Sequence, residues 1–310
     1  MLILNTLAPV FLLIAIGALL QRTGFVSPGF LKEANRVTYW LGLPALIFSQ
    51  LAASFRQGGG AGGMFGTMFG ATCSALLLAY LVGWLMRVPG TSLGTFVHGA
   101  FRGNLAFVGL PIIYSLPDAT LAGGMSVRTA ALVTVAPMMV FYNVAGVVVL
   151  LLSQHTLSWR MVVPFLKQVV TAPPLIATVA GMGFAVAGWR LPVAVDQAFT
   201  ALGEMALPLG LLGVGGALVS GRIGAQWPRP LASALLKTVA LPVLGWVIGR
   251  VIGLGSVGLS AVMILMACPT AVTSYTVAVE LKGDEALASG TIVLSVLTSL
   301  AALVVILAVA

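Results

Sequence analysis

The sequence predicts an all-α membrane protein of ten transmembrane helices, arranged as two inverted five-helix repeats. Of its 310 residues, 60% are hydrophobic and only 7% are charged. Soluble domains carry roughly a quarter charged residues, so this composition excludes a water-soluble fold. At roughly 20 residues for each span plus short connections, the chain accommodates about ten helices and no further soluble domain.

Ten apolar windows, bounded by charged residues, glycine or proline, are the candidate spans. We expect them at about residues 2–20, 34–54, 64–86, 94–115, 127–152, 161–186, 196–219, 230–252, 257–280 and 286–309. The first window lacks the basic start and the small-residue cleavage site of a signal peptide, so we expect it to stay as the first span. The two repeats would then cover residues 1–153 and 160–310.

The net charge of +8 does not indicate nucleic-acid binding, because the Lys and Arg residues are scattered singly between apolar runs. Eleven of the 15, Lys237 among them, lie on or nearest one side of the predicted spans. Positive charge accumulates on the cytoplasmic side, which places both termini outside the cytoplasm. Cys73 and Cys268 lie in apolar runs without a metal or redox spacing, so we expect no disulfide, metal or cofactor.

An internal repeat appears when the sequence is displaced by 164 residues. Five Gly or Pro pairs then coincide: Pro9 and Pro173, Gly17 and Gly181, Gly24 and Gly188, Pro28 and Pro192, Pro44 and Pro208. Because these residues fix special backbone conformations, helices 1 and 2 should share a shape with helices 6 and 7. A half with an odd number of spans reverses direction in the membrane, and such inverted repeats are typical of secondary transporters.

The fourth and ninth spans carry the candidate binding site, because each contains a proline at a corresponding central position. We expect the helices to unwind at Pro111 and Pro269 and to expose backbone amides and carbonyls. Half-helix N-termini would then attract an anion, as they do in transporters. Each proline could instead only kink its helix, but the corresponding positions favour a site. The neighbouring candidates are Asn104, Gly109, Thr270, Thr273 and Ser274.

The segment from Asn104 to Pro111 resembles the crossover motif of the auxin efflux carrier family, within the bile, arsenite and riboflavin transporter superfamily. Glu280, eleven residues after Pro269, extends the resemblance, as do residues 41–48 and 207–212. The resemblance implies a fold like that of bile-acid and sodium–proton transporters. Helices 1, 2, 6 and 7 would form a scaffold, and helices 3–5 and 8–10 a transport domain that moves like an elevator. Broken helices 4 and 9 would cross at the substrate site.

The resemblance also implies a small organic anion as substrate, such as auxin or malonate, and a homodimer. In that family the crossover asparagine contacts the substrate carboxylate, and Asn104 is its match. Asn143 is either a second binding residue or a helix-packing contact. The run from Thr270 to Tyr275 has fewer Gln and Pro residues than the plant carriers, so the identity of the substrate stays open.

Charged residues within predicted spans are candidates for function because burying them in a membrane is costly. Arg102 could attract the anion or could extend to the cytoplasmic interface. Glu204 and Glu280 are candidates for coupling to H⁺ or Na⁺, although Glu204 could pair with a cation and Glu280 could simply end a helix. His98 and His155 are expected at the interface.

The sequence therefore predicts a secondary or facilitative carrier of a small organic anion, embedded in a lipid bilayer. Alternatives are a sodium- or proton-coupled symporter of another solute and a membrane enzyme. A membrane enzyme is not favoured, because the sequence shows no cluster of Asp, Glu or His at catalytic spacing. A channel would need polar residues along most spans, and these are scarce. The abundance of Ala and Gly favours a bacterial inner membrane.

Overall fold

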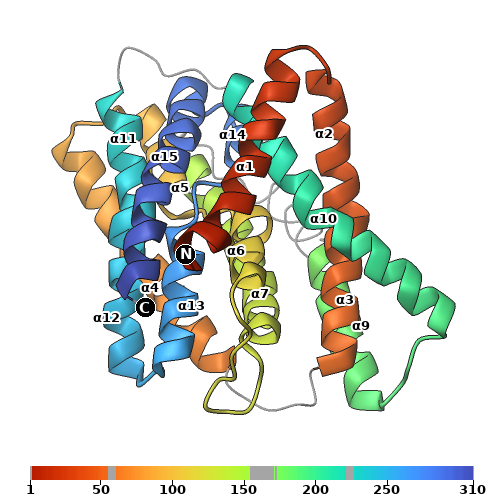
Figure 1. Ribbon diagram of the computed structural model, residues 1–310. Coiled ribbons are helices and arrows are strands. Elements are labelled where there is room, and N and C mark those ends of the chain that lie inside the picture. Colours follow the sequence, from red (N-terminus) through yellow and green to blue (C-terminus); the bar gives the residue numbers. More distant parts are fainter. Residues whose placement is uncertain (1, 55–60, 154–170, 172, 221–226, 310) are drawn as a thin grey trace. The chain divides into compact units, whose positions relative to one another are not determined.

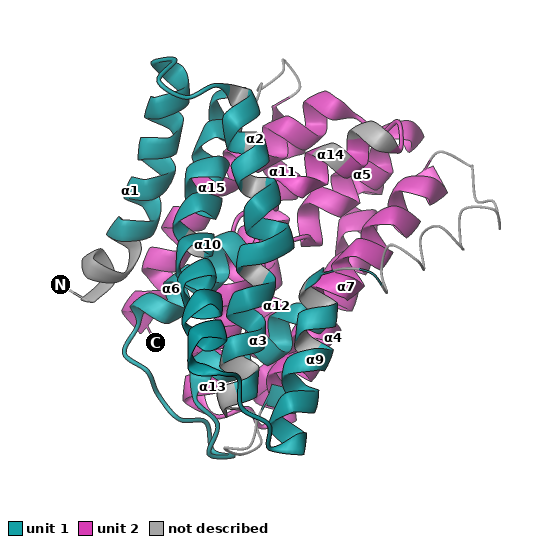
Figure 2. Ribbon diagram, turned by 90° about the vertical axis from the view of Figure 1, so that its right-hand side faces the viewer, with its two compact units in different colours: residues 1–62, 106–137, 167–219 teal, residues 63–105, 138–166, 220–310 magenta. Residues whose placement is uncertain are grey.

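The structure is a computed structural model that describes residues 2–54, 61–153, 171, 173–220 and 227–309 (Figure 1). These residues are helical apart from turns and short connections. The chain divides into two compact units, each built from segments of both halves of the sequence (Figure 2). Unit 1 comprises residues 1–62, 106–137 and 167–219, and unit 2 comprises residues 63–105, 138–166 and 220–310.

Unit 1 contains the first helices of each half of the chain. Its elements are α1 (Leu2–Arg22), α2 (Pro28–Val37), η1 (Thr38–Gly42), α3 (Leu43–Ser54), α6 (Leu110–Ser115), α9 (Pro173–Ala187) and α10 (Val193–Ser220), with most of η3 (Leu105–Gly109). Helix α7 (Val127–Ser153) contributes its residues up to Pro137 to this unit and the rest to unit 2. The π-helical elements are those labelled η.

Unit 2 contains the later helices of each half. Its elements are α4 (Ala61–Leu85, from Gly63), α5 (Gly90–Phe101), α11 (Pro228–Leu235), η4 (Leu236–Ala240), α12 (Leu241–Ile252), α13 (Ser256–Ala267), α14 (Thr273–Glu280) and α15 (Glu285–Val309). Buried hydroxyls join these helices to one another. The Ser233 hydroxyl donates to the Phe96 carbonyl at 2.8 Å, and the Thr238 hydroxyl donates to Thr298 Oγ1 at 2.9 Å.

Within the described residues, five segments are long and apolar enough to cross a membrane. They are Ala61–Leu85, Val127–Ser153, Val193–Gly216, Pro228–Ile252 and Glu285–Val309. Their outer faces carry exposed apolar side chains, such as Leu77 on α4 and Val251 on α12. A bilayer removes such side chains from water, whereas an aqueous surface leaves them exposed. The protein is therefore a multi-pass membrane protein.

Each predicted window contains helix, although four of them, 34–54, 94–115, 230–252 and 257–280, are made of more than one helical segment. The window 161–186 falls partly outside the described residues. Within the described part, helix α9 begins at Pro173. The neighbouring residue His155 also lies outside the described residues. The number of spans and their inverted symmetry stay predictions.

Three of the divided windows contain a π-helical turn placed directly before a Leu-Pro pair. The pairs are Leu43-Pro44 after η1, Leu110-Pro111 after η3 and Leu241-Pro242 after η4. Proline has no N–H and its ring collides with the carbonyl one turn earlier, so a wider preceding turn relieves the collision. The pair is not sufficient by itself, because α10 continues through Leu207-Pro208 without such a turn.

One pair of residues that the 164-residue displacement aligns has the same backbone conformation in unit 1. Gly24 and Gly188, which the displacement aligns, both have φ of 74°. This left-handed conformation favours glycine, and each residue follows closely on the end of its helix, α1 or α9. Glycine also permits close packing between α1 and α10, where Gly17 contacts the Leu212 backbone and Gly215 contacts the Ile14 backbone.

Candidate functional site

The fourth predicted span is interrupted at Arg102–Asn104, between the end of α5 at Phe101 and the start of η3 at Leu105. We had expected the interruption at Pro111. Pro111 instead occupies the second position of α6, where a helix does not need the missing N–H donor. The non-helical residues therefore lie beside Asn104 rather than beside the proline.

The ninth predicted span is interrupted at Cys268–Val272, between α13 and α14, and this segment includes Pro269 as expected. The two non-helical segments pair as an antiparallel bridge between Gly103 and Thr270. The Asn104 N–H donates to the Pro269 carbonyl at 2.8 Å, and the Ala271 N–H donates to the Arg102 carbonyl at 3.0 Å. We call residues 102–104 and 269–271 the crossing. All of them belong to unit 2.

The pairing corrects the expectation that the unwound backbone exposes its polar groups. At the crossing the Asn104 and Ala271 amides bond to the Pro269 and Arg102 carbonyls, since a buried unpaired backbone group is costly. Thr270 is tied down as well: its hydroxyl donates to the Gly99 carbonyl and its N–H donates to Ser295 Oγ, both at 2.9 Å. The Thr270 hydroxyl proton is thus already used inside the protein.

Arg102 lies inside unit 2, with only 8% of its surface exposed. Its Nη2 donates to Asn143 Oδ1 at 2.6 Å, and its Nη1 lies 3.2 Å from His98 Nε2. The alternative of an arginine that extends to the interface is therefore wrong. His98, which we expected at the interface, is also buried. Asn143 thus forms a contact between α7 and the crossing that orients the guanidinium, and its role in substrate binding stays a prediction.

Two further candidates lie in the buried part of unit 2. Asn104 is at the end of the first crossing segment, and Ser274 is the second residue of α14. The Ser274 side chain is 3% exposed, and its hydroxyl has no hydrogen-bond partner among the described residues. Thr273 beside it is exposed. Glu280 ends α14, but its side chain lies outside what the structure describes.

Lys237 is the residue that the sequence analysis missed. It lies in η4 with no exposed surface, and its ammonium donates to the Met266 carbonyl. Counting it as a loop charge was wrong, as it was for Arg102, although the remaining charges keep the same asymmetry. The available signal was a lysine in the middle of an apolar window, where an ionisable residue is a candidate for function.

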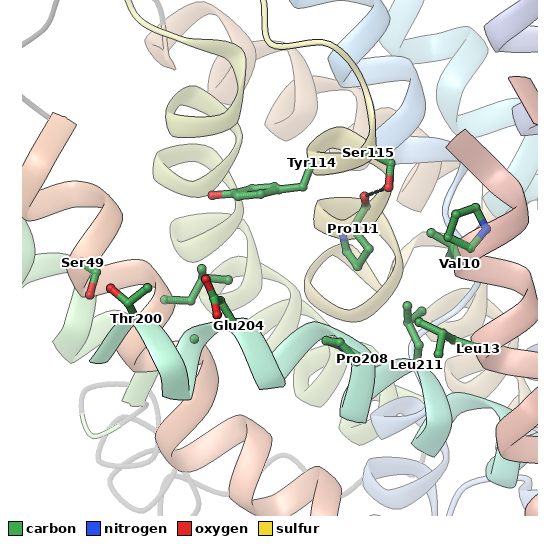
Figure 3. Close-up of a pocket in the computed structure, with 13 residues that line it drawn as sticks. Val10, Leu13, Ser49, Pro111, Tyr114, Ser115, Thr200, Glu204, Pro208 and Leu211 are labelled. Carbon is green, nitrogen blue, oxygen red and sulfur yellow. Dashed lines mark hydrogen bonds between the residues drawn. The ribbon is translucent and has the colours of Figure 1, made fainter. Parts of the chain in front are cut away.

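Unit 1 contains a separate cavity of about 440 Å³ (Figure 3). Its lining is mostly apolar and includes Pro111 and Pro208. The candidate Gly109 is not part of this lining and lies just before α6. At one side the Tyr114 hydroxyl is directed toward the end of the cavity that holds Ser49, Thr200 and the Glu204 carboxylate. The hydroxyls of Ser49 and Tyr114 are buried and lack hydrogen-bond partners among the described residues.

Metal ligation has no support in the described part of the chain, where no three His, Cys, Asp or Glu side chains gather. The two polar sites are instead a crossing with buried cations and a cavity with one carboxylate. In a multi-pass helical protein, such buried polar groups are candidates for the paths and binding sites of solutes and ions.

The comparison with known families agrees with a multi-pass membrane protein that moves solutes. A family model described as membrane transport protein matches residues 2–157 and 142–307, which together cover nearly the whole chain. The chain belongs to this family, the auxin efflux carrier family. No curated protein matches the chain.

Proposed function

We propose that the protein is a secondary or facilitative carrier of a small organic carboxylate, which unit 2 holds at its crossing. The observation that carries the proposal is the buried Arg102 guanidinium, positioned by Asn143 two residues before Asn104. A buried guanidinium attracts an anion strongly because the surrounding dielectric is low. The family membership supports transport rather than catalysis.

Asn104 and Ser274 supply the proposed hydrogen bonds to the carboxylate. The Ser274 hydroxyl is a buried donor with no partner among the described residues, so a ligand oxygen would satisfy it. Ser274 also lies in the first turn of α14, where the helix dipole favours a negative charge. Charge-assisted hydrogen bonds of this kind are about twice as strong as neutral ones.

The transport motion is proposed to be elevator-like, with helices 3–5 and 8–10 moving and helices 1, 2, 6 and 7 acting as the scaffold. The division of the chain supports this in part. Helices α1, α3, α9 and α10 belong to unit 1, and α4, α5 and α11–α15 belong to unit 2, whereas α6 and the first part of α7, which the proposal counts among the moving helices, belong to unit 1. We further propose ten spans in two inverted repeats, both termini outside the cytoplasm, and a homodimer in a bacterial inner membrane. Glu204 and Glu280 remain the candidates for coupling to H⁺ or Na⁺.

The test is a thermal-shift screen of the purified protein against malonate, succinate, acetate and indole-3-acetate. We expect at least one to raise the melting temperature, and Asn104→Ala to weaken its binding by roughly tenfold through loss of one charge-assisted hydrogen bond. Ser299→Ala is the control, because Ser299 is a buried serine of α15 whose hydroxyl bonds only within its own helix.

The screen is decisive because binding does not depend on the direction or energy source of transport. If none of the four acids stabilises the protein, a carboxylate is not the substrate. If an acid binds Asn104→Ala as tightly as the parent, the substrate lies elsewhere than the crossing. Uptake of the bound acid into proteoliposomes would then distinguish a carrier from a protein that only binds it.

A further inference from the structure

Lys237 contacts the crossing although its own helical segment, η4, contains no crossing residue. Its ammonium donates to the carbonyl of Met266, which is the penultimate residue of α13. The last carbonyls of a helix lack partners within the helix and carry its partial negative charge. The ammonium therefore caps the half-helix that leads into the second crossing segment.

The Lys237 ammonium also lies against the first crossing segment. A Cβ atom built on Gly103 would be 2.8 Å from Lys237 Cε and 3.0 Å from Nζ. A side chain at Gly103 would therefore push the end of the lysine away from this position. The positive charge is consequently held next to the backbone of the residue that precedes Asn104.

No carboxylate of the described residues forms an ion pair with Lys237, since the ion pair found among them joins Arg36 and Glu33. A fully buried ammonium is costly unless other groups offset its charge. The helix terminus offsets part of that cost. A bound anion at the crossing would offset more of it, so the lysine favours occupation of the site by an anion.

We propose that Lys237 is the fixed cation of the crossing and supplies positive charge for binding the carboxylate. In secondary transporters, half-helix C-termini and unwound carbonyls coordinate the coupling sodium ion. Here the Lys237 ammonium donates to a carbonyl of that type, at Met266, and so supplies the positive charge that a sodium ion would bring. Carboxylate binding therefore does not need a sodium ion. This inference rests on the proposed function and adds a second cation to its site.

The experiment measures the affinity of the purified protein for the acid found in the screen, in sodium chloride and in N-methylglucamine chloride of equal ionic strength. The parent should bind equally, within about twofold, in both salts. Lys237→Met, which keeps the length of the side chain and removes the charge, should bind at least roughly tenfold more weakly. Thr238→Val is the control, because it alters a buried neighbour without changing the charge.

A second pair of variants tests the position of the charge and serves if Lys237→Met does not fold. Gly103→Ala should weaken binding because its Cβ displaces the ammonium. Gly249→Ala in α12 is similarly crowded, 2.6 Å from Leu259 Cδ1 and 3.2 Å from Thr67 Cγ2, but does not crowd Lys237. Its affinity should therefore stay closer to that of the parent.

Each outcome bears on one of the two proposals. Binding by the parent only in sodium, or parent-like affinity of Lys237→Met, overturns the role of Lys237 and leaves the carrier intact. Equal loss of affinity in Gly103→Ala and Gly249→Ala also overturns that role. Failure of every acid to bind the parent overturns the proposed function and, with it, this inference.

Discussion

Unit 2 and unit 1 each contain buried polar groups among apolar helices, but their charges have opposite sign. At the crossing of unit 2 the charged groups are cations, Arg102 and Lys237. In the cavity of unit 1 the charged group is the Glu204 carboxylate, accompanied by hydroxyls. A site of buried cations selects an anion, whereas a carboxylate among hydroxyls suits a proton or a small cation.

The difference also concerns how well each site is held. The crossing is braced by backbone pairing and by bonds from Thr270 to Gly99 and Ser295. The Ser49 and Tyr114 hydroxyls in the unit 1 cavity lack partners among the described residues. A braced site binds a ligand with little loss of conformational freedom. The comparison therefore supports the proposal that the substrate binds in unit 2, and it makes Glu204 of unit 1 the coupling candidate to test first.

The largest expected effect is that of removing the charge of Arg102. Arg102→Gln should weaken carboxylate binding by about 30-fold or more, because interactions with charged groups contribute roughly 2–3 kcal/mol when buried. Arg102→Lys keeps the charge and should retain most of the affinity. Equilibrium binding of the acid measures both. Equal losses in the two variants would mean that the guanidinium supports the fold rather than attracts the anion.

The helical windows could be predicted because hydropathy is a local property of the sequence. Pro269 lies in the non-helical segment between α13 and α14, where its missing N–H donor would weaken a helix, although α10 continues through Pro208. The interruption predicted at Pro111 was wrong, because a proline in the first turn of a helical segment is compatible with the helix. The π turns before Leu-Pro were not predicted, and α10 shows that the pair alone does not determine them.

The polar contacts of the crossing could not be predicted, because they join residues far apart in the sequence. Arg102 and Asn143 are 41 residues apart, and Thr270 and Gly99 are 171 apart. Lys237 was hidden by the positive-charge count, which treats every lysine as a loop residue. Asn104 was identified from its motif, although its pairing through the backbone was not.

A smaller effect is expected when the bracing of the crossing is weakened. Ser295→Ala removes the acceptor of the buried Thr270 N–H, which should lower the stability of the protein by about 1–3 kcal/mol. The melting temperature of the ligand-free protein reports this loss. Ser299→Ala, one turn along the same helix, should change it little because its hydroxyl donates only to Val296. Equal shifts in the two variants would mean that the bond to Thr270 adds no stability.

The smallest effect on affinity is expected from Glu204, if binding and coupling are divided between the units. Glu204→Gln keeps the shape of the protonated side chain, so carboxylate affinity should change by no more than about twofold. What should change is transport: acid uptake into proteoliposomes should no longer respond to an imposed pH gradient, while exchange of labelled for unlabelled acid continues. Glu285→Gln, whose carboxylate accepts a bond from the exposed Tyr275 hydroxyl, is the control.

Two results would break the comparison at this point. A pH response unchanged in Glu204→Gln would remove coupling from unit 1. A tenfold loss of affinity in the same variant would show that the carboxylate of unit 1 takes part in binding, so the two sites would act on one substrate. If neither occurs, the sign of the buried charge separates their roles: the cations of unit 2 hold the anion, and the carboxylate of unit 1 responds to protons.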